Sequence, residues 1–146
     1  PTVITATLPT ELKFTIDPNA QDEAFSCATG ILSNETPAPI NVTVLSIKSM
    51  PECSVKVVNS DAVEDWDNLG TQDTQSMIAL GIQFFESQEE PSWAPAETSS
   101  NSNGFCNVNV GPNATENYTM VGKCGRAWDT VPTLEYRYRV KVSLAK

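Results

Sequence analysis

Residues 134–144 read Leu-Glu-Tyr-Arg-Tyr-Arg-Val-Lys-Val-Ser-Leu, and this stretch decides the fold class. Apolar side chains occupy every second position, and charged or hydroxyl side chains occupy the positions between them. An alternation with a period of two predicts a β-strand that buries one side and exposes the other. We therefore expect the chain to contain an eleven-residue strand here, with one apolar and one cationic face.

The same alternation recurs upstream in four segments, namely residues 3–8, 12–16, 40–48 and 78–84. Within 40–48 the apolar positions change phase after Val44, which predicts a β-bulge or burial on both faces. No segment longer than two turns carries a helical period, although one helical turn fits before Gly70. We predict an all-β protein, a single immunoglobulin-like or jelly-roll-like β-sandwich of about seven to nine strands.

The 146 residues suit one domain. Pro9 removes a ladder hydrogen-bond donor, so we divide the chain into an N-terminal extension strand, residues 1–9, and a sandwich domain, residues 10–146. Residues 86–104 are poor in hydrophobic side chains and rich in Pro, Ser and Asn, which predicts a long exposed loop.

Composition excludes several classes of function. The net charge of −9 argues against a nucleic-acid binder, which needs a basic face. Histidine is absent, so Ser-His and Cys-His nucleophiles and His-ligated zinc cannot form. We expect neither an enzyme nor a cofactor, and no stretch is long and apolar enough to span a membrane.

Cysteines and sequons point to an extracellular compartment at the cell surface. An even number of widely spaced cysteines predicts two disulfides, and of the three connectivities we favour the two that close short segments, Cys27–Cys53 and Cys106–Cys124. Four Asn-x-Ser/Thr sequons are candidate glycosylation sites, at Asn34, Asn41, Asn113 and Asn117. Four buried free thiols and unmodified surface asparagines remain the alternatives.

Two further features suggest ligand sites. Asp65 and Asp67 lie two residues apart in a polar turn, which suits a calcium ion, although Asx turns explain the same pattern. Trp93 lies in the expected loop and offers a face for stacking on a sugar ring; the alternative is a tryptophan that plugs the end of the sandwich.

Charge is distributed unevenly along the chain. Residues 123–146 carry six basic and two acidic side chains, whereas residues 1–122 carry three basic and sixteen acidic ones. The cationic face of the last strand protects a sheet edge from aggregation, or it meets the acidic surface of an identical neighbour in a head-to-tail contact.

Several segments resemble one group of prokaryotic surface proteins, and these segments are LPTELKFTIDPN (8–19), NVTVLSIKS (41–49), DWDNLGTQDTQSMIALGIQF (65–84) and TLEYRYRVKVSL (133–144). The sequence is similar to β-sandwich surface and filament proteins, including WxL-type Gram-positive surface domains, TasA/camelysin-like filament subunits and archaeal donor-strand pilins. No Trp-x-Leu tripeptide is present, so this chain departs from the WxL pattern. For the filament families the resemblance implies polymerisation by donor-strand exchange.

Two functions follow as hypotheses. In the first, the protein is the structural subunit of an extracellular filament, and its leading strand completes the sheet of the next copy through Val3, Ile4, Ala6 and Leu8. In the second, it is a monomeric surface or adhesin module that binds a glycan, the cell wall or a host protein through the 86–104 loop.

Overall fold

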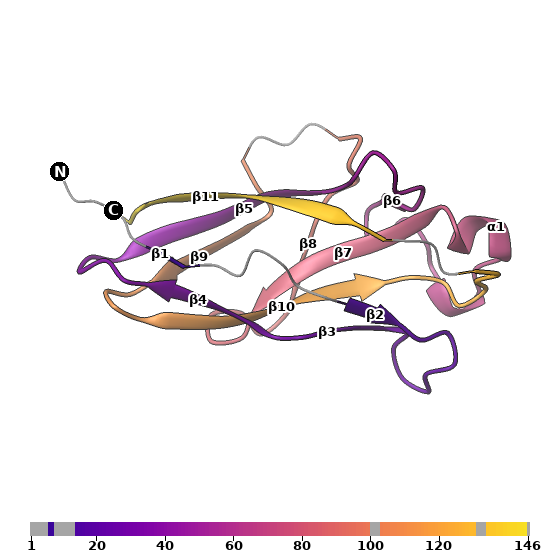
Figure 1. Ribbon diagram of the computed structural model, residues 1–146, viewed down its shortest axis with the longest axis horizontal. Helices are drawn as coiled ribbons and strands as arrows, with labels where there is room; N and C mark the ends of the chain where they lie inside the picture. The colour runs from indigo at the N-terminus through magenta and orange to yellow at the C-terminus, as the bar shows by residue number, and fades with distance from the viewer. Residues whose placement is uncertain (1–5, 8–13, 100–102, 131–133, 146) are drawn as a thin grey trace.

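The computed structural model describes residues 6–7, 14–99, 103–130 and 134–145. These residues form eleven strands and two short helical segments (Figure 1). The strands are β1 (Ala6–Thr7), β2 (Phe14–Ile16), β3 (Phe25–Cys27), β4 (Gly30–Asn34), β5 (Ile40–Ser49), β6 (Lys56–Val57), β7 (Met77–Phe84), β8 (Ser92–Trp93), β9 (Cys106–Val110), β10 (Thr115–Lys123) and β11 (Tyr136–Leu144).

The strands form layered sheets. The larger sheet has the order β1-β4-β10-β7-β6, with β8 also paired to β7, and the smaller sheet has the order β11-β5-β9. β2 and β3 form a separate antiparallel pair. Figure 1 shows β11 and β5 along one side of the molecule and β4, β10 and β3 along the other. The predicted all-β sandwich is confirmed.

The alternating apolar side chains meet between the layers. Leu32, Ile40, Ile78 and Leu80 are fully buried, and they come from strands of both sheets. Phe84 and Tyr118 pack in this core with their ring centroids 5.3 Å apart. This packing explains why residues with a period of two occupy strands that bury one face, whereas β7, buried on both faces from Ile78 to Ile82, is a central strand.

The first two strands were both predicted, and the excess over seven to nine comes from strands that were not, β3, β4 and β8. β2 pairs with β3, whereas β1 pairs with β4, so the expected pair of opening strands contacts two different partners. β6 and β8, of two residues each, add further short strands on β7. The proposed domain boundary at Pro9 lies outside the described residues.

The predicted phase change in β5 is a bulge. Val140 pairs with Val44 and Arg139 pairs with Ser46, so Leu45 is an extra residue on β5. The shift lets both Val44 and Ile47 point into the core, with exposed fractions of 1% and 2%.

The helical segments are short. η1 (Trp66–Asn68) is a 3₁₀ turn before Gly70, as predicted, and α1 (Thr71–Thr74) follows it. Neither of these segments, nor any other part of the described chain, forms a helix with the length and apolarity to cross a membrane.

Candidate functional site

The edge formed by β1 and β4 is where the structure places the candidate donor strand. Ala6 pairs with Asn34 and Thr7 pairs with Ser33, while the other side of β4 pairs with β10. β1 therefore lies at the end of the larger sheet and pairs within its own chain. The remaining candidate donor residues, Val3, Ile4 and Leu8, lie outside the described residues.

Asn34, which pairs with Ala6, lies at the centre of a buried hydrogen-bond network. Its side chain is 1% exposed, and its Nδ2 donates hydrogen bonds to the carbonyl oxygens of Ala38, Val110 and Gly111 at 2.9, 3.1 and 2.8 Å. Its Oδ1 accepts from the Thr36 N–H at 2.9 Å. An oligosaccharide cannot occupy this nitrogen in the folded domain, so Asn34 is removed from the candidate glycosylation sites.

The three other sequon asparagines differ in their surroundings. Asn113 is exposed in the turn between β9 and β10 with φ 53°. Asn117 is half-buried, and its Nδ2 and N–H both donate to the Glu86 carboxylate, which lowers the pKa of Glu86. Asn41 is half-buried and belongs to an amide network on β5 and β9. Asn113 is the most open of the four, and glycosylation there stays a prediction.

The predicted disulfides are wrong. All four cysteines are among the described residues, and each carries a free thiol. Cys106 begins β9 in the smaller sheet, whereas Cys124 directly follows β10 in the larger sheet. Neither Cys27–Cys53 nor Cys106–Cys124 is joined. Closeness in sequence favoured these pairs, but neighbouring segments here enter different layers.

Burial governs the thiols themselves. Cys53, Cys106 and Cys124 are 3 to 4% exposed, and only Cys27 is half-buried at the end of β3. Burial raises the pKa of Cys124 to about 11, with a smaller opposing effect of the Arg126 charge. The Cys106 pKa is also raised by burial. Thiols of this kind stay protonated at neutral pH and act as small apolar side chains.

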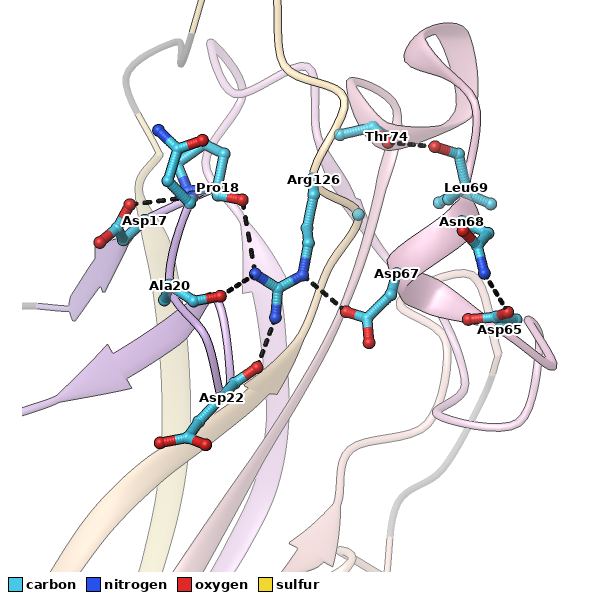
Figure 2. Close-up of polar contacts among 12 residues, drawn as sticks. Asp17, Pro18, Ala20, Asp22, Asp65, Asp67, Asn68, Leu69, Thr74 and Arg126 are labelled. Atoms are coloured by element: carbon cyan, nitrogen blue, oxygen red, sulfur yellow. Dashed lines mark hydrogen bonds and ion pairs between the residues drawn. The ribbon is translucent and has the colours of Figure 1, made fainter.

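The calcium candidates are occupied by protein groups. The Arg126 guanidinium donates through Nε to Asp67 at 2.8 Å and also reaches the carbonyl oxygens of Pro18, Ala20 and Asp22 (Figure 2). The cation at Asp67 is therefore an arginine side chain, which ties the turn after β2 to η1.

Asp65 is engaged separately. It accepts a hydrogen bond from Asn68 Nδ2 within the same turn. Across the described residues, no three acidic or cysteine side chains converge as a metal ion would require. The alternative reading of this segment, local turn chemistry, fits these contacts.

Residues 86–104 are only partly a loop. Ser92 and Trp93 form β8 on β7, and the Ala94 N–H donates to the Leu80 carbonyl at 2.8 Å. The Trp93 ring is half-buried with the Lys123 ammonium 4.9 Å from its centroid. The prediction of an exposed loop is wrong for residues 92–97, because Gly81 leaves room for this segment against β7.

Glu97 was not anticipated as a structural residue. Its carboxylate accepts hydrogen bonds from the Ser49 N–H, the Ser49 hydroxyl and the Val57 N–H at 3.2, 2.8 and 2.8 Å. The segment after β8 is thereby fastened to the ends of β5 and β6. A lone glutamate in a polar stretch gives no sequence signal for such a role.

The expected cationic face exists. Arg137, Arg139 and Lys141 are exposed on β11, and the alternate side chains of that strand pack against the core. Sequence reasoning missed that β9 extends this face with Asn107 and Asn109. The alternation of Asn with Val in residues 107–110 was the available signal.

Comparison with protein-family models, with curated proteins and with solved structures finds no match to this chain. The functional argument therefore rests on the residues and geometry described above.

Proposed function

We propose that this protein is a subunit of an extracellular filament that assembles head to tail by exchange of its leading strand, residues 2–8. The observation that carries the proposal is the attachment of β1. Among the described residues β1 pairs only with the edge of β4, through two residue pairs. An edge strand held this way is the element that strand-addition assemblies transfer between copies.

The rest of the domain keeps its own opening strand when β1 leaves. Phe14 of β2 stacks on Phe25 of β3 with ring centroids 4.9 Å apart, and it also packs 6.1 Å from the ring of Tyr136. β2 therefore contacts β3 and β11 independently of β1.

Strand exchange replaces each contact broken within one chain by the same contact with a second copy. The same register, Ala6 opposite Asn34 and Thr7 opposite Ser33, forms equally well with the β4 edge of a second copy. The closed and exchanged forms then differ little in free energy, and concentration selects between them. The resemblance to TasA/camelysin-like subunits and donor-strand pilins supports the same assignment, with Val3, Ile4, Ala6 and Leu8 as the donor residues.

A cysteine pair tests the exchange directly. In a background with the four native cysteines changed to Ala, we would introduce Thr7→Cys and Ser33→Cys, which are register partners. Directly opposed residues have Cβ atoms about 4.5–5.5 Å apart, close enough to oxidise with a small adjustment. We expect a ladder of disulfide-linked multimers on a non-reducing gel at high protein concentration.

The matched control is the Thr15→Cys and Ser26→Cys pair on β2 and β3, which should form links within one chain at every concentration. Folding of each variant is checked by circular dichroism. If both pairs link only within one chain from micromolar to millimolar protein, strand exchange is wrong. The chain is then a monomeric surface module, with residues 86–104 as its candidate binding segment.

A further inference from the structure

The outward face of the β11-β5-β9 sheet is built from four cross-strand rows of polar side chains. The register places Arg137 beside Lys48 and Arg139 beside Ser46. The next two rows each cross three strands, and they are Lys141-Thr43-Asn107 and Ser143-Asn41-Asn109. Directly opposed residues share a face of the sheet. We call these ten residues the polar face.

The asparagines of the polar face hold one another in place. Asn41 Nδ2 donates to Oδ1 of both Asn107 and Asn109 at 2.8 Å, and Asn107 Nδ2 donates to Asn41 Oδ1 and Thr43 Oγ1 at 2.8 and 2.6 Å. Asn107 and Asn109 are nevertheless exposed. The result is a fixed lattice of amide and hydroxyl groups that faces solvent.

The polar face is positively charged, whereas the protein as a whole is negatively charged. Its four cations are Lys48, Arg137, Arg139 and Lys141, and none of its ten residues is acidic, although the chain carries 18 acidic and 9 basic side chains. Within the described part of the chain, none of these cations forms an ion pair. The nearby Glu97 carboxylate is bound to Ser49 and Val57.

A groove of about 400 Å³ lies beside the cations, and it is lined by Leu45, Ser46, Lys48, Arg139 and residues 95–99, which include Glu97. Ile47 also lines it, and its side chain is only 2% exposed, so it contributes its backbone. The groove thus combines the cations Lys48 and Arg139 with the hydroxyl groups of Ser46, Thr98 and Ser99, beside the Glu97 carboxylate.

We propose that the polar face binds an acidic polysaccharide, with a negatively charged sugar seated in the groove and the chain continuing over the amide rows. Cations separated by one residue on a strand repeat at about 6.6 Å, which suits a polymer with regularly spaced negative charges. Side-chain amides and hydroxyl groups match sugar hydroxyls. None of the ten residues of the polar face is aromatic, so the bases of a single-stranded nucleic acid would have no ring on which to stack. It also lacks the apolar centre of a protein interface.

Affinity electrophoresis and calorimetry with polygalacturonate as the probe test this surface, with neutral dextran for comparison. We expect binding to polygalacturonate, none to dextran, and an affinity that falls with added salt. The Arg139→Ser/Lys141→Ser variant should lose at least tenfold in affinity. The control Lys123→Ser removes one positive charge at an exposed position off the polar face, and it should lose less than threefold, whereas the matched single variant Lys141→Ser should lose more.

Asn107→Asp/Asn109→Asp places carboxylates in the lattice and should also abolish binding. Thermal unfolding of each variant is measured, so that loss of the fold is recognised. Equal losses in the control, or tighter binding of oligo-dT than of polygalacturonate, would overturn the proposal. Absence of binding combined with loss of self-association in Arg139→Ser/Lys141→Ser would instead assign the face to a second copy. The cysteine links between β1 and β4 report separately on strand exchange.

Discussion

The first and last strands of this chain join the sandwich in very different ways. Within the described residues, β1 pairs with β4 through two residue pairs, whereas β11 pairs with β5 through nine. Both reach the same end of the molecule: the partner of Ala6 is Asn34 and the partner of Leu144 is Ile40, and these flank one short turn. In the part of the chain that the structure describes, β11 is therefore the edge strand with the longer pairing.

β11 is held by burial of its apolar side chains as well as by its backbone pairing with β5. β11 packs Tyr136, Tyr138, Val140 and Val142 against the core, and the Tyr136 hydroxyl donates to the Val55 carbonyl at 2.6 Å. Each backbone hydrogen bond contributes only about 1 kcal/mol net, so length and apolar contact decide which edge is permanent. In the filament proposal the first strand is the one that exchanges, whereas β11 presents a fixed surface.

Removing each strand in turn is the strongest way to break this comparison. Deletion of residues 136–146 should abolish cooperative folding, because it removes nine residue pairs and uncovers β5, against a total stability of about 5–15 kcal/mol. Deletion of residues 1–9 should leave a cooperative fold, less stable by about 2 kcal/mol. Urea unfolding followed by tryptophan fluorescence measures both. Equal losses would show that the two edges are attached alike.

Asn34, the β4 residue that pairs with Ala6, can be substituted without any change in β1. Asn34→Ala removes the hydrogen bonds of this side chain with three carbonyl groups and the Thr36 N–H, and it should cost about 3 kcal/mol in the free energy of unfolding. Asn113→Gly also removes a sequon, at an exposed position with positive φ that glycine adopts freely, and should change stability by less than about 0.5 kcal/mol. Similar losses in the two variants would argue against a structural role for Asn34.

A smaller effect belongs to Glu97, which fastens the far end of β5. Burial alone would raise its pKa, but hydrogen bonds from Val57 and Ser49 and the charge of Lys56 together lower it below 4.5. A lowered folded-state pKa adds stability above the unfolded-state pKa, and that stability is lost as the pH falls through the folded-state value. Glu97→Gln should therefore cost about 1 kcal/mol at pH 7, and the deficit should close as the pH falls through the lowered pKa of Glu97.

Chemical unfolding at several pH values measures this deficit. Glu89→Gln is the control, because Glu89 is exposed, and it should leave stability unchanged within about 0.3 kcal/mol. A deficit in Glu97→Gln that is independent of pH would mean that the carboxylate charge does not hold the end of β5.

Local pattern was sufficient for several of the strands. The alternation in 134–144 gave β11 with its apolar and cationic sides, and the phase change after Val44 gave the bulge in β5. The turn before Gly70 was also correct. Each of these features depends on side chains a few residues apart, which the pleat of a strand or one turn of helix relates directly.

Contacts between segments that are far apart in the sequence could not be predicted from the alternation of side chains. The sequence by itself determined a β-sandwich with an acidic body and a cationic last strand. Tertiary structure alone decided that β9 and β10 enter different sheets, that Asn34 is buried and that Asp67 meets Arg126. The physical reason is that alternation specifies which face of a strand is apolar, whereas the partner of that strand depends on how all the apolar faces are buried together.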